Sequence, residues 1–275
     1  IERIKAEQRG GLQVSDVLST AVTFLAQAKM EGLTQSIGPL PEIQNKEVWK
    51  MSPIADKEGH FLFSIPSLTS PWINTKLVKP EEEPKSWRDL LQPRWKGKIS
   101  MGDPDSTPTP VYIYSMLAKK HGVLDDAYFR ELGKMAVLYP TYRMDAAAVA
   151  AGDMAISFAS APTSMAFVLQ AGAPVKAIDM SEGITGSRAV AVSLLTRAPH
   201  ANAARVFMNW WFSREGQHIF HEALGTESVR QDVPNFTPAS GRLTPKNVFW
   251  MSPEEEVEVA SMQRERVVKN LLLGK

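Results

Sequence analysis

The chain has 275 residues, of which 44% are hydrophobic and 22% are charged, and its 31 Lys and Arg against 30 Asp and Glu leave a formal net charge of +1. This composition excludes a disordered chain and gives no uniformly basic surface, so we expect no nucleic-acid partner. Cysteine is absent, which excludes disulfides, thiolate metal sites and cysteine nucleophiles. The length predicts about two domains.

The sequence contains no run of about 18 apolar residues, so it predicts no transmembrane helix. Its first residues, from Ile1 to Glu7, have the pattern of an amphipathic helix without a capping residue before it. We therefore expect the true N-terminus to lie upstream, where any export signal would stand.

Hydrophobic periodicity predicts helices and strands that alternate along the chain. This order favours an α/β fold with mostly parallel sheets and helices on both faces. In the first part of the chain we expect a helix over 1–9, a strand over 14–18, a helix over 19–30, strands over 60–65 and 72–75, and a short helix over 86–91 capped by Ser86. In the middle we expect a strand over 98–101, helices over 109–120, 125–136 and 146–152, a strand over 154–159, a helix over 162–171, and strands over 174–178 and 188–195. The last part is expected to be helical: one helix carries Ala203, Phe207, Trp210 and Trp211 on one face, a second runs from Ser213 to Leu224, and the last begins at Ser252-Pro253.

A charged segment from Lys79 to Lys85, with prolines at positions 80 and 84, has the composition of a linker. It indicates a chain that crosses between two lobes.

The stretch SWRDLLQPRWKGKISMGDP, residues 86–104, resembles a signature of periplasmic solute-binding proteins of ABC transporters. Within that family it is similar to the group of ferric-ion, polyamine and 2-aminoethylphosphonate binders. Residues 1–18, 146–157 and 197–220 resemble further segments of the same group, and Ser213 to Gln217 is the most specific piece of the last one.

The resemblance implies a hinged, two-lobed type 2 periplasmic-binding-protein fold that closes on a small-molecule ligand in an interlobe cleft. Lobe 1 is then discontinuous and consists of residues 1–80 and 188–275, and lobe 2 consists of residues 81–187. The resemblance also implies that the first strand, helix and strand of lobe 1 lie upstream, together with the export signal. It implies a periplasmic location and delivery of the ligand to the membrane permease of an ABC importer. We expect a monomer that has no enzymatic activity, no cofactor and no bound metal.

The turn after the strand over 98–101 carries Ser106, Thr107 and Thr109 and opens a helix. Free backbone N–H groups and hydroxyls at such a helix start favour an anion, and the family uses this turn for ligand contacts. The alternative is a plain N-cap formed by Ser106 or Thr107.

Tyr142 and Arg143 are expected between two helices. An arginine fork there can hold a carboxylate or phosphonate through two hydrogen bonds, and the tyrosine ring can stack on the ligand. The alternative is a surface ion pair between Arg143 and Asp145.

In the iron binders of the family, the segment that corresponds to residues 157–163 carries an adjacent pair of tyrosines that ligate Fe³⁺. Here Ala161, Pro162 and Thr163 stand in that neighbourhood, which argues against iron. Ser160 and Thr163 are candidate hydrogen-bond donors to an organic ligand.

The stretch from Glu182 to Arg188 resembles the hinge loop where the chain returns to lobe 1, and Thr185 and Arg188 are the candidate ligand contacts in it. The alternative is an ordinary glycine-rich turn. His218 and His221 share a helix face but lack further metal ligands, and we assign Phe207, Trp210 and Trp211 to the core.

The function predicted from these residues is capture of a small organic anion, namely a phosphonate, a phosphate ester or a carboxylate. A ferric ion is the alternative within the family, and a polyamine is less supported because no acidic cluster stands at these positions. A LysR-type effector-sensing domain is a further alternative, which would need a helix-turn-helix domain upstream. The common motifs of nucleotide-binding and hydrolytic enzymes are absent from the sequence.

Overall fold

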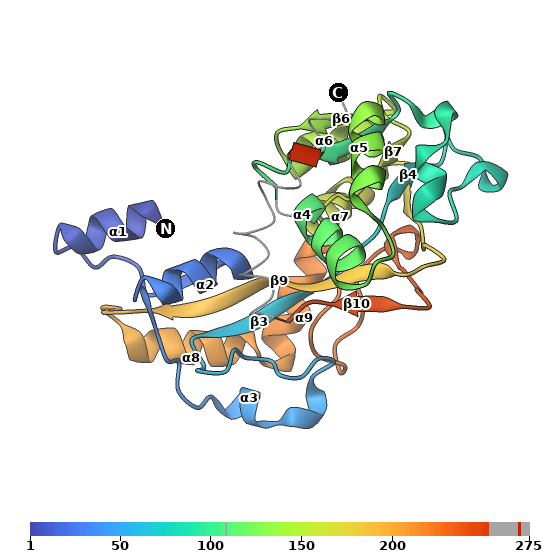
Figure 1. Ribbon diagram of the computed structural model, residues 1–275. Helices are drawn as coiled ribbons and strands as arrows, with labels where there is room; N and C mark the ends of the chain where they lie inside the picture. Colours follow the sequence, from blue (N-terminus) through green and yellow to red (C-terminus); the bar gives the residue numbers. More distant parts are fainter. Residues whose placement is uncertain (108, 253–268, 271–275) are drawn as a thin grey trace. The chain divides into compact units, whose positions relative to one another are not determined.

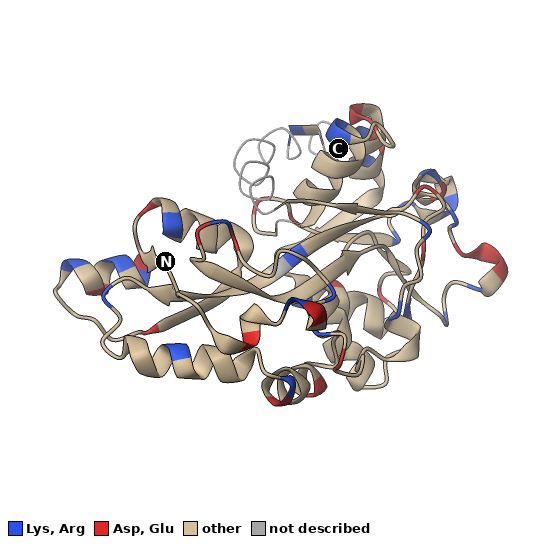
Figure 2. Cartoon of the chain, turned by 90° about the horizontal axis from the view of Figure 1, so that it is seen from below, with Lys and Arg blue, Asp and Glu red and all other residues tan. Residues whose placement is uncertain are grey.

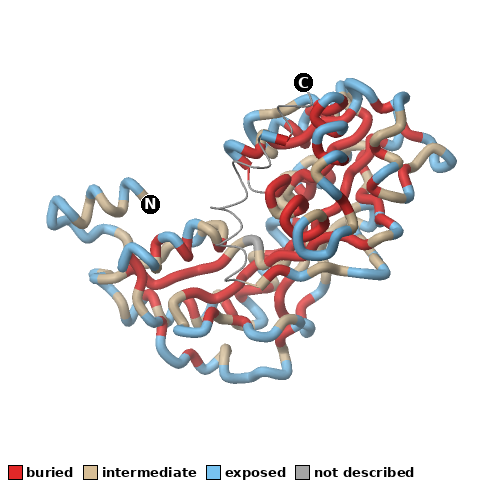
Figure 3. The backbone as a smooth tube through the Cα atoms, in the orientation of Figure 1, coloured by how far each residue is buried: buried red, intermediate tan, exposed pale blue. Residues whose placement is uncertain are grey.

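The computed structural model describes residues 1–107, 109–252 and 269–270. The chain forms two compact units: the first consists of Ile1–Pro66 and Arg188–Phe236, and the second of Ser67–Ser187 and Thr237–Lys275. In each unit the buried backbone is concentrated in the strands and in the helices that pack on them (Figure 3).

The units differ from the lobe boundaries expected from sequence at two places. The first division falls after Pro66 rather than near residue 80, and residues from 237 onward belong to the second unit. Strand pairing explains both differences. The strand β4 (Trp72–Asn74) pairs with residues 156–157 and 175–177 of the second unit, so the chain has already entered that unit before residue 80. The strand β10 (Val248–Trp250) pairs with residues 184–186, which also belong to the second unit. The movement of two lobes about a hinge stays a prediction, and the helix expected from Ser252-Pro253 lies outside the described residues.

The strand β9 (Ile184–Leu195) crosses from the second unit into the first, and the first unit is built around its part from Arg188 onward. It pairs with β1 (Val17–Ala21) and β2 (Thr34–Gln35) in antiparallel direction and also with β3 (Phe61–Thr69). Helix α2 (Val22–Met30) lies on one side of this sheet, and α8 (Ala201–Trp211) and α9 (Arg214–Leu224) lie on the other (Figure 1). The core between them is aliphatic and aromatic, and it includes Leu25, Phe63, Val192, Met208 and Phe212.

Two sequence expectations for this unit are wrong. The helix expected over 19–30 begins only at Val22, because residues 17–21 pair with β9 instead. Phe207 and Trp210 are 42% and 41% exposed, and α8 contributes Ala204 and Met208 to the core in their place. The helix has apolar residues on more than one face, so its periodicity alone does not identify the buried one.

The second unit contains a five-stranded sheet in the order β6-β5-β7-β4-β8. Strand β5 (Ile99–Gly102) runs parallel to β6 (Ala136–Tyr139) and to β7 (Ile156–Ser157), whereas β4 runs antiparallel to β7 and to β8 (Val175–Ala177). The α/β class is confirmed. The sheet is mixed, and the expected parallel pairing holds for its three strands β6, β5 and β7.

The helices of the second unit follow its parallel strands. A helix begins as α4 (Thr109–Ile113) and continues with π-type bonding over Tyr114–Lys120, and α5 (Asp126–Met135) leads into β6. The remaining two are α6 (Tyr142–Ala151) and α7 (Pro162–Gln170). The other helical segments of the described chain are α1 (Glu2–Arg9), α3 (Pro41–Gln44) and the 3-10 turns Lys46–Val48, Pro80–Glu82, Trp87–Leu91, Pro93–Trp95 and Ala239–Gly241.

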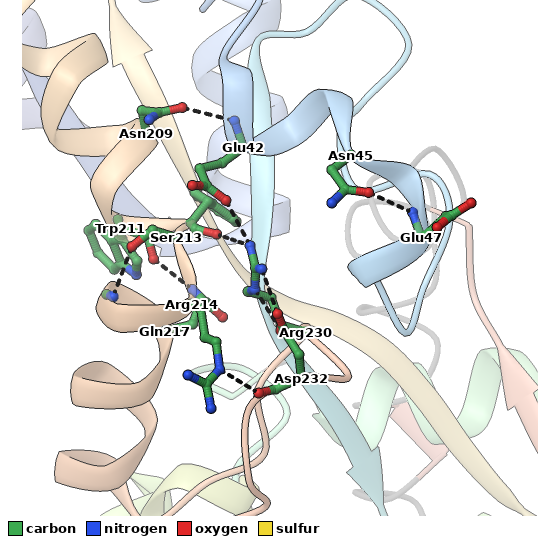
Figure 4. Close-up of polar contacts among 12 residues, drawn as sticks. Glu42, Asn45, Glu47, Asn209, Trp211, Ser213, Arg214, Gln217, Arg230 and Asp232 are labelled. Atoms are coloured by element: carbon green, nitrogen blue, oxygen red, sulfur yellow. Dashed lines mark hydrogen bonds and ion pairs between the residues drawn. The ribbon is translucent and has the colours of Figure 1, made fainter.

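The Ser213–Gln217 motif holds α8 and α9 together in the first unit. Ser213 caps α9 by accepting a hydrogen bond from the N–H of Gly216 at 3.1 Å. A Cβ atom on Gly216 would lie 2.2 Å from the carbonyl oxygen of Trp210, so only glycine permits this close approach. The buried Gln217 side chain donates to the carbonyl of Trp211 at 3.1 Å (Figure 4).

Arg230 is a buried cation that connects three segments of the first unit (Figure 4). Its Nε and Nη2 donate to the two carboxylate oxygens of Asp232 at 2.8 Å each, and Nη1 donates to Glu42 at 2.9 Å and to the carbonyl of Phe212 at 3.0 Å. The carboxylate of Asp232 is the main cause that raises the pKa of Arg230. A charge with this set of partners stays ionised and fixes its loop against α3 and the end of α8.

His221 is fully buried on α9, and burial lowers its pKa from 6.5 to about 4. Its Nε2 lies 3.2 Å from Gln217 Oε1, and its Nδ1 lies 2.9 Å from the hydroxyl of Thr226. Since an amide oxygen only accepts hydrogen bonds, Nε2 carries the proton and Nδ1 accepts from Thr226. The folded chain therefore holds a neutral imidazole.

We expect His221 to make the first unit sensitive to acid. Between pH 6.5 and about 4 the unfolded chain binds a proton that folded His221 does not, so this contribution to the free energy of unfolding falls as the pH falls. The full loss is about 3 kcal/mol. Urea unfolding measured across this pH range should show a shallower decline in His221→Gln. The exposed neighbour variant His218→Gln should keep the wild-type slope, and identical slopes in wild type and His221→Gln would contradict the assignment.

Candidate functional site

The carboxyl ends of β5, β6 and β7 lie at one edge of the second sheet, because β5 is parallel to both neighbours. Each strand is followed by a turn that leads into a helix: α4 after β5, α6 after β6 and α7 after β7. In α/β folds this edge is where ligands bind. Seven of the residues predicted from sequence stand on these three turns and helix starts: Ser106, Thr107, Thr109, Tyr142, Arg143, Ser160 and Thr163.

The turn after β5 is held by Asp103. Its N–H donates to the carbonyl of Tyr139 at 2.8 Å, and its own carbonyl accepts the N–H of Thr107 at 2.7 Å and the Thr107 hydroxyl at 2.8 Å. A Cβ atom on Gly102 would lie 2.5 Å from Thr107 Oγ1, so glycine makes room for this side chain. The hydroxyl of Ser106 donates to the carbonyl of Pro140 at 2.7 Å, which joins this turn to the one after β6.

Tyr142 and Thr109 are in direct contact. The phenol oxygen accepts the backbone N–H of Thr109 at 2.8 Å and lies 2.6 Å from the Thr109 hydroxyl. Burial raises the pKa of Tyr142, so the phenol stays neutral. The backbone donor that we expected to face a ligand is thus occupied by Tyr142, and the polar surface at this point is the tyrosine hydroxyl.

Tyr142 and Arg143 form the first turn of α6, not a link between two helices, because Thr141 caps the helix by accepting the N–H of Met144 at 3.2 Å. Arg143 is exposed, and its guanidinium lies 5.7 Å from the centre of the Phe167 ring on α7. The alternative ion pair with Asp145 is not formed, since Asp145 is fully buried and accepts hydrogen bonds from Ser100 and Ser157. Arg143 places a positive charge at the rim of this edge.

The start of α7 lies beside the same edge. Ala161 precedes the helix and gives no side-chain cap, Pro162 is its first residue, and Thr163 is half-buried in its first turn. The hydroxyl of the fully buried Ser160 lies 3.4 Å from the carbonyl of Tyr142, at the limit of a hydrogen bond. In the first turn of this nine-residue helix Pro162 has no N–H, and the N–H of Ser164 donates to the carbonyl of Ala161 at 2.9 Å. The turn therefore offers the N–H of Thr163 and the positive end of the helix dipole.

Asp145 is a residue of this edge that the sequence analysis considered only as a surface partner. It lies on the buried face of α6 with Ala146, Ala148 and Val149. Its position in the sequence could have identified it as buried. Asp145 stands three and four residues before Ala148 and Val149, so it shares their face of the helix, and that face packs on the core.

Thr185 and Arg188 stand on β9 and not on these three turns. Thr185 is buried in β9 of the second unit and pairs with Phe249 of β10, whereas Arg188 belongs to the first unit and its guanidinium lies 5.2 Å from the Phe63 ring. The expected hinge loop is a strand from residue 184 onward. Gly186 permits close packing, since a Cβ there would lie 2.7 Å from Trp250. A ligand role for Thr185 and Arg188 stays a prediction.

Two general features concern metals and membranes. Across residues 1–107 and 109–252, no three His, Cys, Asp or Glu side chains come together in a group that could hold a metal ion. Within the same described ranges, none of the helices combines the length and the apolar character that crossing a membrane requires.

Solved structures with the same fold are periplasmic binding proteins. The protein AfuA from Actinobacillus pleuropneumoniae, solved with exogenous fructose-6-phosphate bound, superposes with a TM-score of 0.72 at 22% identity and covers 98% of this chain and 84% of its own. The periplasmic binding protein P5PA gives 0.74 at 19% identity over 98% and 86% of the two chains. The ferric binding protein from Campylobacter jejuni gives 0.77 at 16% identity over 98% and 88%. The fold is therefore that of periplasmic binding proteins.

The family model of the bacterial extracellular solute-binding proteins matches residues 13–244, and the chain belongs to this family. The resemblance inferred from the sequence motifs is thereby confirmed. An uncharacterized protein of Haemophilus influenzae is 28% identical over 170 residues, which are 60% of this chain and 49% of that protein. The match to this relative thus spans about half of its length.

The contact between Gly102 and Thr107 gives a stability test of the turn. We expect Gly102→Ala to lower the free energy of unfolding by about 1–3 kcal/mol, because the new methyl group overlaps Thr107 Oγ1. Adding Thr107→Ala should recover part of this loss, since it removes the overlapping atoms. Adding Ser106→Ala, whose hydroxyl bonds elsewhere, should be additive. The free energies of unfolding are measured with denaturant. If the losses of the single variants add up in both double variants, the turn adopts another conformation.

Proposed function

We propose that this chain is the substrate-binding component of an ABC importer and that it captures a small organic anion: a phosphonate, a phosphate ester or a carboxylate. The observation that carries the proposal is the set of groups at the ends of β5, β6 and β7. Hydroxyls from three turns, the uncapped start of α7 and the exposed Arg143 all lie at this edge. Hydroxyl groups and one exposed cation suit an anionic ligand. The acids of the same edge, Asp103 and the exposed Asp105, belong to the turn after β5.

Family membership supports the transport role. AfuA, which shares the fold, was solved with a phosphate ester bound, so a protein of this architecture accommodates such a ligand. We propose delivery to the membrane permease of the importer, a periplasmic location and a monomeric protein that does not chemically change its ligand. In both units Lys and Arg are interspersed with Asp and Glu (Figure 2), in agreement with the near-zero net charge.

Ferric ion is the second candidate, because the ferric binding protein of Campylobacter jejuni shares the fold. The chemistry of this edge supports the organic anion instead. Fe³⁺ needs phenolate and carboxylate oxygens, but Ala161 and Pro162 offer no side-chain ligand. Burial also raises the pKa of Tyr142, which opposes the phenolate form that iron requires.

A thermal-shift panel tests the ligand class. The compounds are fructose 6-phosphate, 2-aminoethylphosphonate, inorganic phosphate, citrate, ferric chloride and spermidine. A true ligand at 100 times its dissociation constant should add about 2.7 kcal/mol to the free energy of unfolding. Stabilisation by one of the organic anions supports the proposal, and stabilisation by iron or spermidine alone contradicts it.

Arg143 should contribute to affinity without supporting the fold, because its side chain is exposed. We expect Arg143→Ala to weaken binding of the stabilising anion by about 10-fold to 100-fold, which is the effect of losing a charged hydrogen bond. The melting temperature without ligand should stay unchanged. Arg130→Ala, an equal change of charge on the exposed side of α5, is the matched control and should keep full affinity. Unchanged affinity in Arg143→Ala would remove Arg143 from the site.

A further inference from the structure

Asp145 is a buried carboxyl group on α6, the helix that begins at the candidate anion site. It is fully buried on α6, three residues after Tyr142. One carboxyl oxygen accepts the hydroxyl of Ser100 from β5, and the other accepts the hydroxyl of Ser157 from β7 at 2.7 Å. These partners are neutral, and none of the ion pairs formed within the described part of the chain includes Asp145.

The surroundings of Asp145 offer little compensating charge. Helix α6 packs against β4, β5, β6, β7 and α7. Of these elements, β4, β5, β7 and α7 contain no ionisable side chain, β6 ends at Tyr139, and α6 itself contributes Tyr142 and the exposed Arg143. A buried carboxylate without a cation is costly, and burial accordingly raises the pKa of Asp145.

The hydrogen bonds around Asp145 can be satisfied in both of its charge states. The ionised group accepts from Ser100 and Ser157. Ser100 Oγ also lies 3.3 Å from the carbonyl oxygen of Ile156. A protonated Asp145 can therefore donate to Ser100 Oγ while the Ser100 hydroxyl turns to that carbonyl. Neither state leaves a buried polar group without a partner.

Asp145 is also coupled to the residues that face the ligand. It lies three residues after Tyr142 on α6, and, in addition to burial, its charge contributes to the raised pKa of the Tyr142 phenol. It also accepts the hydroxyl of Ser157, three residues before Ser160 on the turn after β7. A negative charge at this place repels a bound anion across a medium of low dielectric constant. An anion at the edge therefore favours the protonated carboxyl group.

We propose that Asp145 is a specificity-determining residue of the anion site, and that capture of an anionic ligand is coupled to retention or uptake of one proton at its carboxyl group. The inference rests on the proposed function, because it requires an anion at this edge. By linkage, affinity for the anion falls as the pH rises and Asp145 ionises, by up to tenfold for each pH unit. A cationic ligand would give the opposite sign.

Sulfate is the first probe, because it remains a dianion throughout the range from about pH 5 to about pH 8 over which Asp145 is tested. Its dissociation constant is measured by calorimetry at constant ionic strength, in two buffers with different enthalpies of protonation. Wild type should bind sulfate more weakly as the pH rises and should show proton uptake. Asp145→Asn, which keeps the shape of the side chain, should bind with a constant affinity and without proton uptake.

Asp153→Asn is the matched control, because it removes the same charge from an exposed position just after α6. It should keep the wild-type pH profile. Equal pH profiles of sulfate affinity in wild type and Asp145→Asn would overturn the inference but leave the anion site in place. A wild-type affinity for sulfate that rises with pH would have the same meaning. If neither sulfate nor fructose 6-phosphate binds wild type or either variant, the anion site itself is wrong and the inference falls with it.

A second measurement covers the case in which Asp145→Asn does not fold. The carbon-13 resonance of the Asp145 carboxyl group in wild type follows its titration directly. We expect it to titrate above the ordinary range of an aspartate and to move further upward when sulfate is added. A titration at the ordinary value, or one that sulfate leaves unchanged, would overturn the inference.

Discussion

Parallel pairing of β5 with β6 on one side and β7 on the other is the constraint on which the candidate site depends. Gly102 is opposite Tyr139, and Ser100 is opposite Ser157, so the three strands end at one edge. The turns that follow them meet there, and the contact between Thr109 and Tyr142 joins two of them although these residues are 33 positions apart in sequence. A change of register by one residue would turn the side chains of the shifted strand, such as Ser100 of β5 or Ser157 of β7, to the opposite face of the sheet.

The protein buries charge in two different ways. In the first unit, the carboxylates of Glu42 and Asp232 surround Arg230, so its charge is permanent and its role is structural. In the second unit, the carboxyl group of Asp145 accepts hydrogen bonds from the hydroxyls of Ser100 and Ser157. The first arrangement fixes a loop, whereas in the second we propose a carboxyl group whose charge depends on pH and on an anion at the candidate site. This difference is the physical reason for placing the proposed response to a ligand in the second unit.

Sequence reasoning succeeded where the determining interactions are local. Ser86 and Ser213 cap helices as predicted, because an N-cap depends on residues within one turn. Strand β6 was missed because the helical periodicity of α5 runs directly into Ala136, and only pairing with β5 defines the strand. The residues of the candidate site were chosen from the sequence, and their ligand roles stay predictions. Their contacts were not, because the Tyr142 phenol reaches the Thr109 N–H only through the register of a sheet.

The measurement that tests the account most directly is an amide NMR titration of the labelled protein with fructose 6-phosphate and with sulfate. The account predicts that the largest shifts occur at residues 106–107, 109, 141–143 and 160–163, the turns at the ends of β5, β6 and β7. Resonances of the first unit around Arg230 should change little, since that charge is already paired. Shifts confined to residues away from these turns would contradict the account.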